Sequence, residues 1–321
     1  MAASDIWLVG DEVAGRTARE WAQEWSSVVA INMVAATDLA NCTAGPSPGP
    51  RGPKPWLISV NSTAIMGRAV LERFEGRAVN IHPGRLPDFG GLYAVQWAIR
   101  LGESATAATA HFMTETLDAG DVIYVAPVPI RPHDTGLSAW LRCLRAQAGI
   151  LKWLLTEIAA GGELPRVSQD LSLRRCFKAA DALGDQLPSH LHATEAERWV
   201  RAGNYLPLSS PTYRPTLMIP SPRLTLRLDE VAVADCGAAM DLAPGEARAL
   251  DGKLIVGCAA GSALLLKRAR VVASGELPSQ WSRAVDNLGR CFVRVGNDHS
   301  SGDGSSPRTN GIPASAWRWG G

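Results

Sequence analysis

Four polar residues in the middle of the chain have the types and the spacing that acyl transfer needs. Asn80 and His82 lie two residues apart at the end of a short apolar run, and Asp118 and Asp121 lie in a later turn. An amide can donate N–H groups to a developing oxyanion, an imidazole can act as acid or base, and a carboxylate can orient that imidazole. The stretch 79–121 therefore predicts an acyl-transfer site, provided that its two halves lie at neighbouring strands.

The elements that must position these residues alternate between strand and helix. Residues 6–9 form a continuous apolar run, which is typical of a buried parallel strand, and residues 13–25 have helical spacing. Strands are next predicted at 27–34 and 56–60, and a helix at 64–74. This order predicts an α/β fold with a largely parallel sheet.

The next part of the chain predicts two more strands and a long helix. The strands are expected at 105–113 and at 124–130, where two prolines favour a sheet edge. The helix begins after Asp134-Thr135 with a plausible cap and continues to about residue 160, where Gly161-Gly162 ends it. A linker and a helix near 195–202 follow.

From about residue 211 the pattern changes to short apolar runs that are separated by Pro, Gly and Asp. This spacing predicts a small β-rich, barrel-like domain, with an OB-like barrel as one form of it. We expect a catalytic domain over residues 1–205, the β-rich domain over 206–295, and a disordered tail over 296–321, which is rich in Gly, Ser and Asp at its start.

Composition excludes several classes of protein. A net charge of +1 over 321 residues gives no general basic bias, so we do not expect a nucleic-acid partner. The six cysteines show no metal-ligand spacing, which indicates reduced thiols and predicts no metal site. The first ten residues contain an acid and no basic flank, and no apolar run approaches the ~18 residues of a membrane span. The prediction is a cytoplasmic protein without membrane association; a homodimer stays open.

Three motifs of the chain together resemble the signature of the folate-dependent formyltransferases. They are Asn80-Ile81-His82-Pro83, Leu86-Pro87 and Leu117-Asp118-Ala119-Gly120-Asp121. The resemblance implies a Rossmann-like α/β domain over roughly residues 1–205, N10-formyltetrahydrofolate as the formyl donor and an amine as the acceptor. A weaker likeness continues into the C-terminal part, as in methionyl-tRNA formyltransferase and its small-molecule relatives. The Pro/Gly-rich segment 44–55 departs from the family, which has more regular structure there.

The resemblance also assigns roles to single residues. Asn80 and His82 would stabilise the oxyanion, with His82 protonated, while Asp118 would raise the pKa of His82 and assist proton removal. His111, on the strand before Asp118, could border the folate site or simply pack. The other residues expected at the folate are Thr63, Ala64, Ile65, Met66, Thr114, Glu115, Thr116 and Asp121. Those expected at the acceptor are Gly90, Gly91, Tyr93 and Gln96.

The acceptor amine is the least determined part of the prediction. A module that binds tRNA should be basic, yet residues 211–290 contain ten Lys or Arg and eight Asp or Glu. The segment Pro83-Gly84 and the run after Gly90 also differ from the tRNA enzyme and resemble the formyltransferases of natural-product pathways. We therefore expect a small or carrier-bound amine of a secondary metabolite, an amino acid or an amino sugar. Methionyl-tRNA formyltransferase, formyltetrahydrofolate hydrolase and a non-catalytic folate-binding protein stay as alternatives.

Overall fold

A mixed six-stranded sheet forms the first half of the protein. The computed structural model describes residues 4–25, 29–40, 54–181, 184–234 and 242–289. In sheet order the strands are β2 (Val29–Met33), β1 (Ser4–Gly10), β3 (Trp56–Val60), β4 (Ala78–His82), β6 (Ala105–Phe112) and β7 (Val122–Pro129). The first four are parallel, whereas β6 is antiparallel to both β4 and β7. The direction of the strands thus changes at β4, the strand that carries Asn80 and His82.

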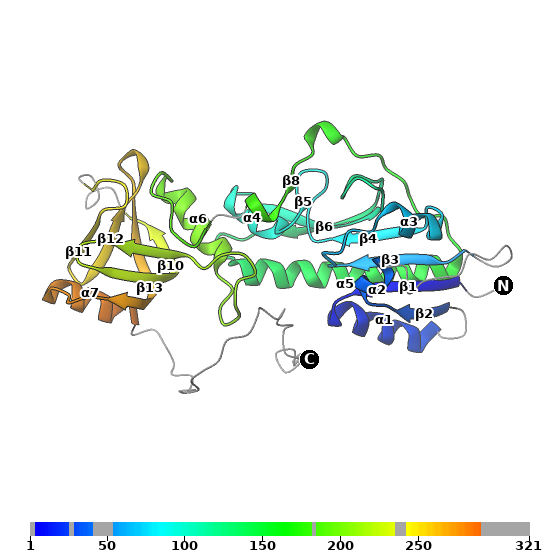
Figure 1. Ribbon diagram of the computed structural model, residues 1–321, viewed down its shortest axis with the longest axis horizontal. Coiled ribbons are helices and arrows are strands. Elements are labelled where there is room, and N and C mark those ends of the chain that lie inside the picture. The colour runs from blue at the N-terminus through cyan, green and yellow to red at the C-terminus, as the bar shows by residue number, and fades with distance from the viewer. Residues whose placement is uncertain (1–3, 26–28, 41–53, 182–183, 235–241, 290–321) are drawn as a thin grey trace. The chain divides into compact units, whose positions relative to one another are not determined.

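Helices cover both faces of this sheet (Figure 1). On one face α1 (Glu12–Trp25) and the long α5 (Gly136–Ala160) pack against each other and against the apolar core, together with α4 (Ala94–Arg100). On the other face are α2 (Ala36–Ala40), α3 (Arg68–Leu71) and the 3-10 turn Glu72–Phe74. Burial on both faces explains why residues 57–60 on β3 are all buried and nearly all apolar.

Helix α5 begins and ends where its sequence predicts. Thr135 is the N-cap and forms a capping box with Ser138, and Gly161 ends the helix in the left-handed conformation. The buried Gln147 of α5 donates from Nε2 to the carbonyl oxygen of Ile81, 2.8 Å away. This bond ties the helix to β4 between the two candidate catalytic residues.

The second half contains a curled five-stranded antiparallel sheet, which confirms the predicted barrel-like character. Its order is β11 (Ala247–Leu250), β12 (Lys253–Gly257), β13 (Ala263–Ser274), β10 (Leu224–Val233) and β9 (Thr216–Ile219). Leu224, Leu226 and Leu228 alternate toward a separate apolar core, which also receives α6 (Ala193–Gly203) and α7 (Ser279–Gly289). Helix α6 contacts both α4 and β10, so it bridges the two halves.

Several predicted elements differ from the observed ones. Residues 64–67 precede α3 instead of belonging to it, and the runs near 224 and 230 are one strand, β10, interrupted by a bulge. Strand β11 and helix α7 were not predicted, although the apolar residues Trp281, Ala284, Val285 and Leu288 of α7 have helical spacing. The segment 44–53 and the tail 296–321 lie outside the described residues.

The predicted domain boundary near residue 205 stays a prediction, since residues 1–290 form one compact unit that contains both sheets. Among the described helices, none is long and apolar enough to cross a membrane.

Candidate active site

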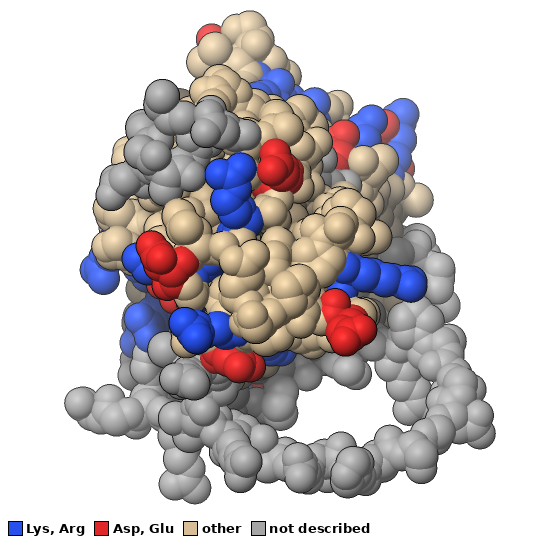
Figure 2. All heavy atoms as spheres, turned by 90° about the vertical axis from the view of Figure 1, so that its left-hand side faces the viewer, with Lys and Arg blue, Asp and Glu red and all other residues tan. Residues whose placement is uncertain are grey.

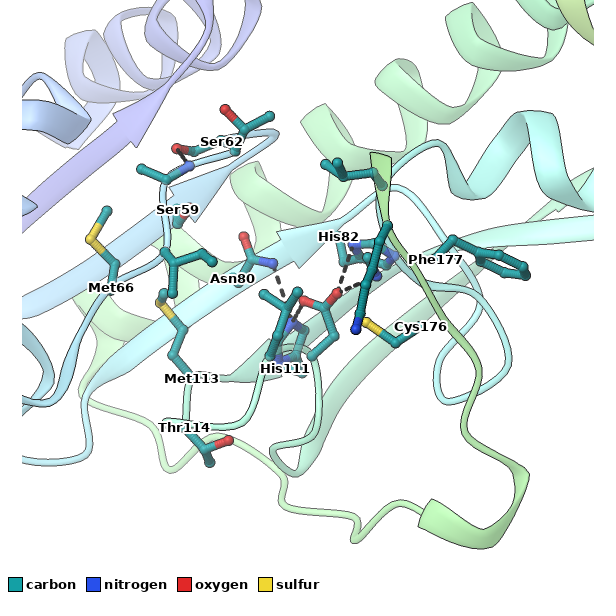
Figure 3. A pocket seen from close by; sticks show the side chains of 18 of the residues that line it. Ser59, Ser62, Met66, Asn80, His82, His111, Met113, Thr114, Cys176 and Phe177 are labelled. Atoms are coloured by element: carbon teal, nitrogen blue, oxygen red, sulfur yellow. Dashed lines mark hydrogen bonds and ion pairs between the residues drawn. The ribbon is translucent and has the colours of Figure 1, made fainter. Parts of the chain in front are cut away.

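A pocket of about 520 Å³ opens beyond the C-terminal ends of β3 and β4 (Figure 3). Small-molecule sites of α/β sheets are typically found at such strand ends, near the point where the strand order changes. Asn80, His82, His111 and Asp118 all line this pocket. The three residues that the sequence predicts as catalytic, Asn80, His82 and Asp118, therefore line the same cavity as His111.

The antiparallel register places Asn80 on β4 directly opposite His111 on β6. Nδ2 of Asn80 lies 3.2 Å from Nε2 of His111, and Nδ1 of His111 lies 2.9 Å from the carbonyl oxygen of Phe112. With its proton on Nδ1, the imidazole donates to Phe112 and accepts one amide N–H of Asn80 at Nε2. The second N–H of Asn80 is then available to a ligand oxygen. His111 thus orients Asn80, a role that the sequence did not indicate.

Asp118 lies between the two imidazoles. Its Oδ1 is 3.5 Å from Nε2 of His111, its Oδ2 is 3.7 Å from Nδ1 of His82, and Oδ2 accepts the backbone N–H of Gly91 at 2.7 Å. The residue has a positive φ of 53°, which is uncommon for a residue other than glycine. Gln169 supports this turn by donating to the backbone carbonyl of Asp118 at 3.0 Å.

The pKa of the Asp118 carboxyl is about 2, below its ordinary value of 3.8. Burial alone would raise this pKa, but the contact with His111, the positive charge that His82 acquires when it is protonated and the N–H of Gly91 outweigh it. Asp118 is therefore an anion at every physiological pH.

His82 is buried, with 4% of its surface exposed, and its Nε2 lies 2.6 Å from the carbonyl oxygen of Phe89. Gly84 makes this contact possible, because a Cβ there would lie 2.3 Å from the Phe89 oxygen and 2.6 Å from Nε2 of His82. Burial lowers the pKa of His82 below 6.5, although Asp118 and Phe89 act in the opposite direction. The resting imidazole is therefore neutral at pH 7. This differs from the expected protonated donor, since Asp118 does favour the charged ring but does not overcome the cost of burying it.

The residues predicted at the folate divide into two groups. Thr63, Ala64, Ile65, Met66, Thr114 and Glu115 line the pocket. Thr116 and Asp121 are not among the lining residues, and both stabilise the turn that carries Asp118. The carbonyl of Thr116 accepts the Thr114 hydroxyl at 2.8 Å, and the carbonyl of Asp121 accepts the backbone N–H of Phe112 at 2.9 Å. All four residues predicted in the loop after β3 therefore line the pocket.

The predicted acceptor residues are placed unequally. Gly91 lines the pocket and adopts a φ of 78°, and a Cβ there would lie 2.2 Å from the carbonyl oxygen of Phe177. Gly90 lies against the Asp118 side chain. Tyr93 and Gln96 are not among the lining residues, and Gln96 is buried in α4. Only the two glycines are thus near the chemistry.

A segment that the sequence did not signal forms one wall of the pocket. Residues 174–179, here called the strap, include β8 (Cys176–Phe177), which pairs in parallel with β5 (Gly90–Gly91). The N–H of Gly90 donates to Arg175 and the N–H of Leu92 to Phe177, over 3.0 and 2.8 Å. A strand of two residues has no periodicity that a sequence can show.

A column of stacked side chains anchors the strap. The ring centroid of Phe177 is 4.4 Å from that of Trp97 and 6.0 Å from that of Phe89. The guanidinium of Arg100 lies 3.8 Å above Trp97 and 5.9 Å from the ring of Tyr213, beside β9. The column therefore connects the pocket wall to the second half of the protein.

Comparison with known proteins agrees with this site. Residues 56–151 match the family model described as formyl transferase. The match contains β3, β4, β6 and the turn of Asp118, so the resemblance to the folate-dependent formyltransferases is confirmed.

Two curated relatives each match a part of the chain. Methionyl-tRNA formyltransferase of Synechococcus sp. (strain JA-3-3Ab) is 34% identical over 106 residues, which cover 33% of each chain. Phosphoribosylglycinamide formyltransferase of Haemophilus influenzae is 42% identical over 79 residues, which cover 25% of this chain and 37% of the relative. The chain spans about a third of the length of the curated relatives that it matches.

Solved structures extend the likeness of the formyl transferase fold over most of the chain. The N-formyltransferase from Helicobacter canadensis has a TM-score of 0.61 at 14% identity, covering 83% of this chain and 99% of its own. WlaRD, a sugar 3N-formyl transferase, has a TM-score of 0.62 at 13% identity, covering 86% and 100%. At this level of identity the likeness shows a shared fold.

Proposed function

We propose that the protein transfers a formyl group from N10-formyltetrahydrofolate to the primary amine of a small molecule. The observation that carries this proposal is the cluster in which Asn80 has one N–H free, His82 is neutral and Asp118 is an anion, all at the base of one pocket. Formyl transfer needs an N–H donor at the formyl oxygen and a route for one proton. The cluster supplies both.

The pocket fits a folate of this kind. Its volume of about 520 Å³ lies in the range of small-molecule sites, and Ile65, Met66 and Met113 offer apolar contacts beside the backbone of the loop 62–66. Ile65 is 70% exposed, so its side chain offers an apolar surface that a bound ligand can cover. When bound, formyltetrahydrofolate supplies a formyl group on a nitrogen that can leave. Thr63, Ala64, Ile65, Met66, Thr114 and Glu115 would hold it.

The chain's residues then have distinct tasks. Asn80, held by His111, donates its second N–H to the formyl oxygen, where negative charge develops. Neutral His82 keeps its Nε2 proton on the Phe89 carbonyl and accepts the amine proton at Nδ1, the nitrogen nearest Asp118. The Asp118 anion stabilises the imidazolium that forms, and His82 can return this proton to the leaving nitrogen. One proton leaves the amine and one reaches the leaving nitrogen, so the transfer balances.

An amino-sugar nucleotide is the acceptor that we infer first. The Helicobacter canadensis enzyme is described in complex with folinic acid and dTDP-3-aminofucose, and WlaRD with dTDP and 5-N-formyl-THF. Lys178 and Arg174 on the strap add positive charge to the acceptor side of the pocket, which suits an acceptor with a phosphate or carboxylate. Around the five-stranded sheet, Figure 2 shows Lys and Arg interspersed with Asp and Glu, which does not favour a tRNA.

The test is single-turnover consumption of N10-formyltetrahydrofolate with a panel of amines that includes dTDP-3-amino sugars, amino acids and charged initiator tRNA. Consumption that requires a small amine, with the formyl group recovered on it, is the expected result. Consumption that requires the tRNA would assign a different acceptor class. Release of formate without any amine would identify a hydrolase, and folate binding without turnover would contradict catalysis.

A further inference from the structure

A second polar pocket lies where the loop after α6 meets the five-stranded sheet. Its volume is about 130 Å³, and its wall includes residues 203–210, β10 and β13. It shares no lining residue with the active-site pocket. Three arginines line it, Arg214, Arg227 and Arg270, against one carboxylate, Asp229. The proposed formyl transfer uses none of these residues.

The strand register brings two of these arginines together. Arg227 on β10 is the direct antiparallel partner of Arg270 on β13, so both side chains project from the same face. Like charges directly opposite each other destabilise a sheet unless something balances them. The structure therefore contains a repulsive pair of arginines at the wall of this pocket.

Asp229 balances this pair only in part. A bulge between Leu228 and Glu230 leaves Asp229 without a partner in the register, and its side chain is buried, with 4% of the residue exposed. Its Oδ1 accepts from Nη2 of Arg270 at 3.1 Å, while its Oδ2 has no hydrogen-bond partner among the described residues. Arg227 forms no ion pair within the described part of the chain.

Two buried donors complete the pattern. The Nε atoms of Arg227 and Arg270 are buried, and neither has a hydrogen-bond partner in the described ranges. The Arg270 side chain as a whole is 41% exposed, so an anion from solvent can reach its guanidinium. An arginine fork matches the oxygens of a phosphate or a carboxylate. Ser209 and Ser210 add hydroxyl groups to the same wall. The unpartnered Oδ2 of Asp229 can accept from a protonated oxygen of such a group.

We propose that this pocket binds a small oxyanion between Arg227 and Arg270. Its volume of about 130 Å³ is sufficient for one phosphate- or carboxylate-sized group. A free ion and the terminal phosphate or carboxylate of a metabolite share this chemistry. Pro215, the residue before β9, also lines this pocket.

The experiment titrates the full-length protein with inorganic phosphate, acetate and a phosphate monoester at constant ionic strength, by calorimetry. Wild-type protein is expected to bind one phosphate, and Arg227→Gln and Arg270→Gln are each expected to weaken binding at least ~10-fold, as for the loss of a charge-assisted hydrogen bond. Arg248→Gln is the matched control, because Arg248 is an exposed arginine of the same sheet outside the pocket. It is expected to bind like wild type.

The three ligands distinguish the possible sources of the oxyanion. If the monoester binds more tightly than phosphate, the natural ligand is a phosphorylated metabolite. If the two bind equally, it is a free phosphate ion, and if acetate binds most tightly, it is a carboxylate. Each of these results supports the oxyanion site. Absence of binding by wild-type protein at millimolar concentrations would overturn the proposal, as would unchanged binding in both pocket variants. Circular dichroism of each variant shows that it is folded before it is titrated. Because no folate or amine is present, the result is independent of formyl transfer.

Discussion

The two pockets differ in whether their buried polar groups have hydrogen-bond partners within the described residues. In the active site, Asn80, His82, His111 and Asp118 satisfy one another or a backbone group, so the cluster is arranged before any ligand binds. In the second pocket, Arg227 and Arg270 are directly opposite each other, the one carboxylate contacts only Arg270, and the buried Nε atoms of both arginines have no partner in the described ranges. A preorganised cluster is suited to stabilise charge that develops during a reaction, whereas an unbalanced one is suited to take up a charge that already exists. The predictions below test whether this contrast holds.

Replacing His82 with alanine should have the largest effect. Loss of a positioned acid/base typically lowers turnover by ~10²–10⁴-fold, and we expect kcat to fall in this range with little change in KM for the folate. His190→Ala removes an exposed histidine that is not among the residues lining the pocket, and it should keep wild-type turnover. Near-normal kcat in His82→Ala would mean that proton transfer does not pass through this residue.

Leu226→Ala should damage the second region without altering the chemistry of the first. Leu226 is fully buried in the core of the five-stranded sheet, and such truncations cost ~2–5 kcal/mol in the free energy of unfolding. Urea unfolding measures this loss, and kcat at low temperature should stay at the wild-type value. Thr225→Ala, on the opposite face of β10, is the control. A loss below ~0.5 kcal/mol, the usual range of surface changes, would mean that the sheet is not independently packed.

Acid should destabilise the active-site cluster. The pKa of Asp118 falls from 3.8 to about 2 on folding, which contributes about 2 kcal/mol of stability above pH 4 that is lost as the pH falls toward 2. The lowered pKa of the buried His82 acts in the same direction, because below pH 6.5 the unfolded chain binds a proton at His82 more tightly than the folded chain does. Urea midpoints between pH 7 and pH 3 measure both.

Asp118→Asn distinguishes this effect from general acid unfolding. The variant should lose the part of the pH dependence below pH 4, while wild-type protein keeps it. Identical acid profiles for the two proteins would show that the Asp118 carboxyl does not carry the stabilisation.

Trp97→Ala should have the smallest effect and act on the acceptor side. Removing the ring that stacks on Phe177 frees the anchor of the strap, and we expect KM for the amine to rise by ~10-fold, equivalent to ~1.4 kcal/mol. Steady-state kinetics at saturating folate separate KM from kcat, and Trp97→Phe, which keeps an aromatic ring, should restore most of the affinity. Equal losses in kcat would instead indicate that the strap positions the catalytic cluster.

The sequence predicted what depends on local pattern. The strands at 56–60 and 105–112, the caps of α5 and the positions of Asn80, His82 and Asp118 follow from apolar runs and turn residues. It could not predict what depends on register or on burial. His111 became the partner of Asn80 because β6 pairs antiparallel with β4, and His82 is neutral because the folded chain excludes water from it. The strap could not be predicted for the same reason, since Cys176 and Phe177 form a strand only by pairing with Gly90 and Gly91.

The placement of the strap has a consequence for how this protein can change. The groups proposed to perform the chemistry lie within residues 79–121, whereas one wall of the same pocket comes from residues 174–179, more than fifty positions later. Mutation or recombination in the later stretch can therefore reshape that wall while the earlier one keeps its hydrogen bonds. A library confined to positions 174, 176 and 178, with Phe177 kept as the anchor, is a direct route to variants that accept other amines.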